Sequence, residues 1–175
     1  MLIRLRKKII FALRRLNFYR TRKRPCKGVQ FFERVKIECP DLTIGEYSQI
    51  RCNVQFLGKG RIEIGSHTQI GDNSIIYSFQ GGGVDIGDNV WVAPNCYIVD
   101  CDHCTKKDVL IRNQGAVVKP VIIGNDVWLG NGVTVLKGIH IHDGAVVGAG
   151  SVVTKDIPEN AVSVGVPARV IKYRE

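Results

Sequence analysis

Residues 99–104, with the sequence VDCDHC, bring together the side-chain types that most often carry out acid–base chemistry or bind metals. The imidazole of His103 can take a proton near pH 7 as a general base, and a nearby carboxylate can orient the ring, as in a catalytic triad. We assign this orienting role to Asp100, with Asp102 or a backbone carbonyl as the alternatives. The two flanking thiols could join His103 as zinc ligands, but adjacent His and Cys side chains rarely point at one ion, and no second Cys-x-x-Cys motif is present. The residue types alone thus make His103 a candidate general base, with a solvated loop histidine as the alternative, and we expect no metal.

A six-residue repeat is the strongest pattern in the chain. From Ile44 onward an apolar residue opens each hexad, and seven of these fifteen residues are followed directly by Gly, which we expect to relieve the backbone at each corner. The fifteen are Ile44, Ile50, Phe56, Ile64, Ile70, Ile76, Ile86, Val92, Ile98, Ile123, Leu129, Val135, Ile141, Val147 and Val153. A period of six fits neither a helix nor an alternating sheet. It fits an all-β solenoid whose coils each contain three short strands.

The repeat slips only after Phe56, Ile76 and Ile98, by two, four and nineteen extra residues. Each slip follows a third hexad, so all three insertions should leave from the same edge of the prism. The longest insertion, about residues 99–120, carries His103. The other histidines, His67, His140 and His142, fall on outer hexad positions, where we expect solvated corner residues.

The repeat and the C-terminal sequence resemble the hexapeptide-repeat acyltransferases. Residues 120–172, PVIIGNDVWLGNGVTVLKGIHIHDGAVVGAGSVVTKDIPENAVSVGVPARVIK, are similar to the corresponding part of the galactoside and maltose acetyltransferases, in the branch that also includes polysaccharide O-acetyltransferases. The resemblance implies a left-handed parallel β-helix of about five coils. It also implies a homotrimer, with acetyl-CoA as the donor substrate in the groove between neighbouring subunits.

The resemblance also implies site residues. The family's active-site histidine falls on His103. The positions that contact the donor fall on Asn131, Ala149, Thr154, Lys155, Arg169 and Lys172. A Lys charge suits the CoA phosphates, and the backbone N–H of Asn131 could hold the thioester oxygen as an oxyanion donor. An acceptor-binding asparagine of the sugar enzymes falls on Gly71, with Asn73 close by, so the acceptor should differ from a free galactoside or maltose.

We therefore expect an acetyltransferase that moves acetyl from acetyl-CoA to a sugar hydroxyl of a cell-surface polysaccharide or a lipid-linked oligosaccharide. An amino-sugar N-acetyltransferase, on the same scaffold and with the same donor, is the alternative enzyme. A non-catalytic β-helix serving as a scaffold subunit is the alternative of another class.

The positive charge of the chain belongs to its N-terminus. Ten of the twenty-five Lys and Arg residues and none of the sixteen acidic residues lie in residues 1–24. Residues 2–16 place apolar side chains at helical spacing, which predicts a basic amphipathic helix that binds an anionic membrane surface through residues 2–24 or caps the solenoid. We expect no nucleic-acid partner, because few aromatic residues are interleaved with the charges. The chain should be cytoplasmic, and peripheral at the inner face of the membrane in the case that this segment binds there.

We divide the chain into three parts. Residues 1–40 form the basic N-terminal segment, residues 41–160 the β-helix with its loop at about 99–120, and residues 161–175 a C-terminal tail that contributes to the CoA site.

Overall fold

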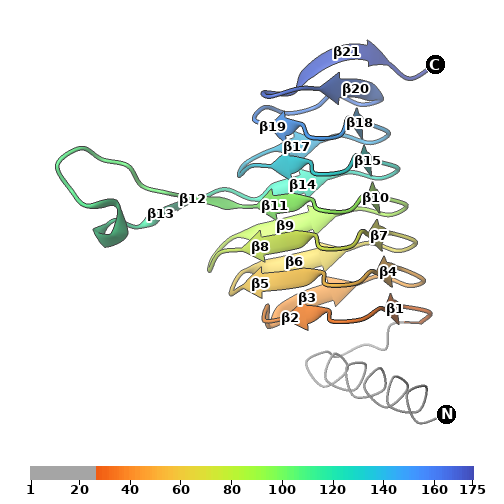
Figure 1. Ribbon diagram of the computed structural model, residues 1–175, viewed down its shortest axis with the longest axis horizontal. Coiled ribbons are helices and arrows are strands. Elements are labelled where there is room, and N and C mark those ends of the chain that lie inside the picture. The colour runs from red at the N-terminus through yellow and green to blue at the C-terminus, as the bar shows by residue number, and fades with distance from the viewer. Residues whose placement is uncertain (1–26) are drawn as a thin grey trace, which may run out of the picture.

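The structure is a computed structural model that describes residues 27–175. The basic helix predicted for residues 2–16 lies outside these residues. The described chain winds into a solenoid whose coils each pass through three parallel sheets, A, B and C in that order, as Figure 1 shows. The predicted all-β parallel β-helix is therefore confirmed. The left-handed sense implied by the resemblance stays a prediction.

Each sheet stacks one short strand per coil. Sheet A contains β1 (Gln30–Phe31), β4 (Gln49–Ile50), β7 (Gln69–Ile70), β10 (Trp91–Val92), β15 (Trp128–Leu129), β18 (Val146–Val147) and β20 (Ala161–Val164), and β21 (Arg169–Tyr173) adds antiparallel to β20. Sheet B contains β2 (Lys36–Ile37), β5 (Gln55–Gly58), β8 (Ile75–Ser78), β11 (Tyr97–Val99), β16 (Thr134–Val135) and β19 (Val152–Val153). Sheet C contains β3 (Asp41–Ile44), β6 (Arg61–Ile64), β9 (Gly83–Ile86), β14 (Val121–Ile123) and β17 (His140–Ile141).

The hexad residues form the core. All fifteen are at most 3% exposed, and residues of equal rank in successive coils are register partners, as in Ile50↔Ile70 and Ile70↔Val92. The residues four positions later in the hexads also point inward, and the polar ones bond to the next coil. The Ser48 hydroxyl, for example, donates to the carbonyl of Gly65 at 2.8 Å and accepts from the N–H of Thr68 at 3.0 Å. The interior is thus a set of stacked apolar columns with hydrogen-bonded hydroxyls between them.

The glycines that follow the hexad residues act differently from the expectation. Gly71 has no left-handed φ; instead a β-carbon at this position would lie 2.5 Å from the carbonyl carbon of Ala93 in the next coil. The left-handed φ falls two residues later, at Asn73 (60°), and Asn tolerates this conformation better than most residues. Glycine after the hexad residue therefore permits close stacking of the coils. The turn itself is made two residues later, by Asn73 in this coil and by Gly132 and Gly150 at the equivalent positions of later coils.

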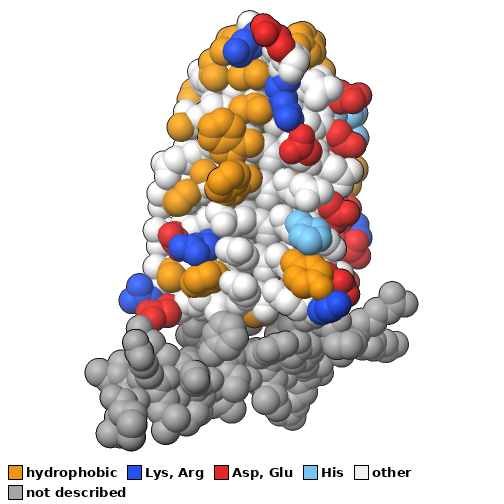
Figure 2. All heavy atoms as spheres, turned by 90° about the vertical axis from the view of Figure 1, so that its right-hand side faces the viewer, with side chains coloured by type: hydrophobic (Ala, Val, Ile, Leu, Met, Phe, Trp, Pro, Cys, Tyr) orange, Lys and Arg blue, Asp and Glu red, His pale blue; other side chains and the backbone are white. Residues whose placement is uncertain are grey.

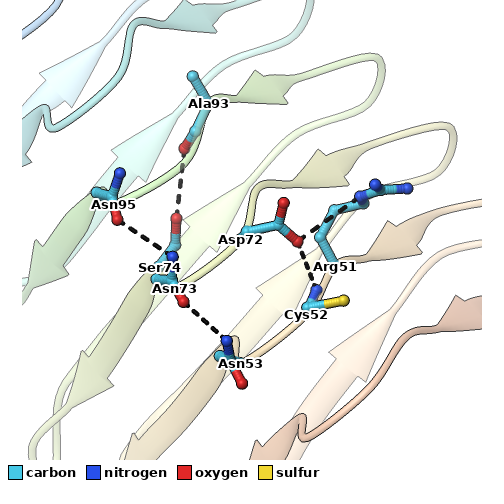
Figure 3. A network of polar contacts seen from close by, with 8 residues as sticks. All are labelled: Arg51, Cys52, Asn53, Asp72, Asn73, Ser74, Ala93 and Asn95. Carbon is cyan, nitrogen blue, oxygen red and sulfur yellow. Dashed lines mark hydrogen bonds and ion pairs between the residues drawn. The ribbon is translucent and has the colours of Figure 1, made fainter.

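The asparagines of the corner between sheets A and B, here called the AB corner, also bond to one another. The Asn53 amide donates to Asn73 at 2.9 Å, and the Asn73 amide donates to Asn95 at 3.3 Å (Figure 3). This ladder runs up one edge of the solenoid and ties three coils together. The side chain of Asn73, which lies near the predicted acceptor position, uses both its amide oxygen and its amide nitrogen in this ladder.

The solenoid is longer than the fifteen hexads. It begins before residue 41, because β1 and β2 already pair with β4 and β5. It continues past residue 160, because β20 stacks on β18. Sheet A therefore contains seven parallel strands, and the five predicted coils are flanked by partial coils at both ends. None of the described residues belongs to a helix long and apolar enough to cross a membrane.

All insertions leave from the corner between sheets B and C, here called the BC corner, as predicted. The largest forms an antiparallel hairpin of β12 (Cys101–His103) and β13 (Ala116–Val118), with a 3-10 turn at Ile111–Asn113 near its tip. Figure 1 shows the hairpin projecting far from the prism at the level of β11 and β14.

Candidate active site

The root of the hairpin forms one wall of a cleft of about 310 Å³. His103, the last residue of β12, pairs with Ala116 of β13 and is exposed. The cleft is lined by Tyr77, Phe79, Tyr97, Val99, Cys101, Asp102, His103, Ala116 and Leu136. The predicted base therefore lies beside a concave surface that a small molecule can enter, between the hairpin and the outer face of sheet B.

Asp100 does not lie in this cleft. It is fully buried, and its carboxylate accepts hydrogen bonds from the Ser78 hydroxyl at 2.7 Å and from the N–H of Phe79 at 2.8 Å. Its carbonyl accepts from the N–H of Lys119 at 2.9 Å. Asp100 thus ties both strands of the hairpin root to the coil below, and the structure gives its carboxylate partners other than His103.

The second carboxylate, Asp102, pairs with Lys137 of the next coil. Asp102 and His103 both contribute to the lining of the cleft, but residues alternate sides along a strand, so their side chains leave β12 in opposite directions. Burial raises the pKa of the neighbouring Cys101 thiol, and the negative charges of Asp100 and Asp102 raise it further, whereas Lys137 lowers it. Cys101 is therefore held as a protonated thiol near neutral pH.

The three other histidines lie away from the cleft. His67 takes a left-handed φ at the corner between sheets C and A and stacks on Tyr47. His140 and His142 stack on each other, with ring centroids 3.7 Å apart, at the end of β17. Within residues 27–175, no three His, Cys, Asp or Glu side chains are arranged to hold a metal ion.

Three of the predicted donor residues follow the AB corner. Asn131 and Ala149 occupy equivalent turns of successive coils, and the N–H of Gly150 donates to the carbonyl of Asn131 at 2.8 Å. Arg169 follows on the next coil, opposite Val164 at the end of β20. All three are exposed, so they form a line up one edge of the prism.

The other predicted donor residues lie elsewhere. Thr154 and Lys155 follow β19 at the BC corner and are exposed, two coils above the hairpin. Lys172 lies in β21, opposite Val162, on the sheet A side. His103 and the line of Asn131, Ala149 and Arg169 therefore border opposite edges of sheet B within one chain.

Sequence reasoning missed the aromatic wall of the cleft. Tyr77 directly follows the inward Ile76, and Tyr97 directly precedes the inward Ile98, so alternation along the strands turns both outward. Burial raises the pKa of the Tyr97 phenol, and the nearby Cys101 raises it further. The alternation rule, applied at the edge that carries all the insertions, would have found both residues.

The outer face of sheet A shows a second group of exposed aromatic residues. Trp91 and Trp128 are register partners and are 60% and 53% exposed. Figure 2 shows hydrophobic side chains gathered on the upper part of this face.

Comparison with known proteins places this architecture in a known class. Residues 61–99 match a model described as the hexapeptide repeat of succinyl-transferase, and residues 120–155 match one described as bacterial transferase hexapeptide (six repeats). The galactoside O-acetyltransferase of Escherichia coli (strain K12) is 40% identical over 74% of this chain and 63% of its own length. The chain thus spans less than two thirds of that relative.

Two solved structures extend the match. A maltose O-acetyltransferase from Clostridium difficile 630 is 34% identical, covers 84% of this chain and 67% of its own, and superposes with a TM-score of 0.57. A galactoside acetyltransferase in complex with coenzyme A is 33% identical, covers 82% and 64%, and has a TM-score of 0.52. The chain belongs to the hexapeptide-repeat transferase family.

Proposed function

We propose that this protein transfers an acetyl group from acetyl-CoA to a sugar hydroxyl, with His103 as the general base. The observation that carries the proposal is the position of His103: of the four histidines, it alone lines the cleft at the hairpin root. The names of the relatives support both halves of the reaction, because one is a galactoside O-acetyltransferase and another was solved with coenzyme A.

The chemistry follows from the side chains. The neutral imidazole removes the hydroxyl proton as the oxygen attacks the thioester carbonyl carbon. The C–S bond then breaks, and the imidazolium returns the proton to the leaving thiolate. The backbone N–H of Asn131 is the proposed donor to the oxyanion, and Asp100 positions the hairpin that carries the base.

The separation of these groups supports the proposed homotrimer. His103 lies on a hairpin that leaves the BC corner, whereas Asn131, Ala149 and Arg169 follow the AB corner. In the proposed assembly, the AB corner of one copy faces the hairpin of the next, and acetyl-CoA lies between them.

The sharpest test is His103→Ala. Loss of a general base should lower turnover by about 100-fold or more, while acetyl-CoA affinity and the oligomeric state stay unchanged. His67→Ala is the matched control, since His67 lies at another corner. Release of the CoA thiol measures turnover, and wild-type turnover in His103→Ala would refute the assignment.

The donor site is tested separately. Lys155→Ala and Arg169→Ala each remove an exposed charged donor proposed to meet the CoA phosphates and nucleotide, so each should weaken acetyl-CoA binding by about 10-fold or more. Lys27→Ala is the control, because Lys27 lies over the Tyr47 ring at another corner. Calorimetry showing equal affinity in all three variants would remove both residues from the site.

The finer identity of the acceptor, a cell-surface polysaccharide or a lipid-linked oligosaccharide, is linked to residues 2–24. If their ten positive charges hold the enzyme at an anionic membrane, the full chain should sediment with anionic vesicles, and less so as salt rises. A chain that ignores such vesicles at low salt would contradict the membrane part of the proposal.

A further inference from the structure

A second cleft, of about 480 Å³, adjoins the cleft of His103. The two share Tyr77 and Phe79 as a common wall. The remaining lining residues of the second cleft are Glu38, Leu57, Gly58, Lys59 and Gln80, so this cleft follows the BC corner down toward the first coils. A ligand that fills one cleft can therefore extend into the other across the two aromatic side chains.

The wall between the clefts is held rigidly. A β-carbon at Gly58 or at Gly60 would clash with Ser78 of the next coil, so the loop that contains Lys59 lies tightly against that coil. The N–H of Gly60 donates to the carbonyl of Ser78 at 2.9 Å. Ser78 and Phe79 are in turn bound by the buried carboxylate of Asp100. One column of contacts thus fixes the Lys59 loop, Phe79 and the hairpin root of His103 relative to one another.

The composition of the second cleft suits a carbohydrate. Phe79 is 37% exposed and, with Tyr77, offers aromatic surface to the apolar C–H face of a sugar ring. Lys59, Gln80 and Glu38 supply polar groups that can bond to hydroxyls around that surface. A cleft of this volume, lined by apolar and aromatic side chains together with a few polar groups, is the usual form of a small-molecule site.

We propose that the second cleft binds the sugar residue next to the one that is acetylated, so that the acceptor is an oligosaccharide or the end of a glycan. The inference rests on the proposed function, because it takes the cleft of His103 as the place of acetyl transfer. Its new content is the subsite formed by Lys59, Gln80 and Leu57 beyond Phe79.

The experiment measures kcat/KM for acetyl-CoA turnover with acceptors of increasing length: glucose, maltose and maltotriose; galactose and lactose; N-acetylglucosamine and its β-1,4-linked dimer and trimer. Binding energy from a remote part of the substrate raises kcat/KM, so in at least one series the value should rise by about tenfold or more from one sugar to two. Leu57→Trp, which fills the second cleft, and Lys59→Ala should abolish this rise and leave the monosaccharide value within about twofold.

Matched controls change similar residues elsewhere. Ile122→Trp enlarges a 40% exposed side chain on sheet C, and Lys27→Ala removes an exposed charge at another corner; both should keep the rise. Equal kcat/KM for one sugar and two, or a rise that survives Leu57→Trp, would overturn the second subsite and leave the acetyltransferase proposal standing. A wild-type enzyme that acetylates no carbohydrate in any series would overturn the proposed function, and this inference with it.

Discussion

The AB corner and the BC corner belong to the same coils, yet they differ in the lengths of their connections and in the hydrogen bonds between coils. At the AB corner, successive coils turn over equal lengths of chain, and Asn53, Asn73 and Asn95 bond directly to one another. At the BC corner the connection varies from a short turn to the hairpin of β12 and β13. The strands on both sides of the BC corner stay in register although its connections differ in length, because the extra residues leave the prism there. Stacking therefore requires equal strands in successive coils, and it tolerates unequal connections at one corner.

The two corners also carry different parts of the proposed active site. The regular AB corner presents an exposed line of equivalent positions, Asn131, Ala149 and Arg169, which suits an extended ligand such as the arm of CoA. The irregular BC corner provides the cleft, the base and the aromatic wall. The equal turns of the AB corner thus place equivalent residues in a row, whereas the unequal connections of the BC corner enclose a cleft.

The largest expected effect separates the coils from the hairpin. Ile70 is fully buried between two register partners, so Ile70→Ala should lower the free energy of unfolding by about 2–5 kcal/mol. Leu110 near the hairpin tip is 63% exposed, so Leu110→Ala should change it by no more than about 0.5 kcal/mol. Urea denaturation measures both, and similar losses would show that the hairpin tip is packed as tightly as the coils.

A smaller effect distinguishes glycines of the two regions. A β-carbon at Gly71 would meet backbone atoms of Ala93 and Pro94, which cannot move without displacing a coil, so Gly71→Ala should cost about 1–3 kcal/mol. Gly115, directly before β13, has open space around it and no left-handed φ, so Gly115→Ala should be nearly neutral. Thermal unfolding of both variants checks the contrast, and a tolerated Gly71→Ala would mean that the coils stack more loosely than described.

The sequence was sufficient for the parts of the fold that repeat. The lattice from Ile44 to Val153 identified fifteen core residues and the corner of the insertions, because stacking forces a strict period. The last coil was missed because Ser163 takes the place of an apolar residue in β20. The first coil keeps the spacing, since Phe31 and Ile37 lie six residues apart and are register partners of Ile50 and Phe56, so the pattern could have been extended to it. Neither the bonds of Asp100 nor the shared wall of the clefts follows a period, so they emerged only from the structure.

The two carboxylates of the hairpin root, Asp100 and Asp102, should differ in their contribution to stability, which urea denaturation measures. Asp100→Ala leaves the Ser78 hydroxyl and the Phe79 N–H without their acceptor, which should cost about 1–3 kcal/mol of stability. Asp102→Ala removes a half-exposed ion pair and should cost at most about 1 kcal/mol.

The pH dependence of turnover separates two roles for Asp100. A residue that only positions the hairpin leaves the acidic limb of the pH profile in place, even as kcat falls. A carboxylate that faces His103 stabilises the imidazolium, so its removal would move the acidic limb of the profile to lower pH. The hydrogen bonds of Asp100 predict the first outcome; a shifted limb would restore the orienting role.

The smallest effect concerns two thiols, one inside the coils and one at the root of the hairpin. Burial raises the pKa of both Cys96, inside the coils, and Cys101, at the hairpin root, but only Cys101 also experiences Asp100 and Asp102. Because only the thiolate reacts, Asp102→Asn should lower the pKa of Cys101 and speed its alkylation by iodoacetamide severalfold at pH 7.5. Cys96 should react as slowly as before, since no carboxylate contributes to its pKa.

Lys137→Met should act in the opposite direction at Cys101, because the ammonium group lowers that pKa. Peptide-resolved mass spectrometry follows each site separately. If both thiols accelerate together in Asp102→Asn, the hairpin root has opened as a whole, and the electrostatic distinction between the two regions is wrong.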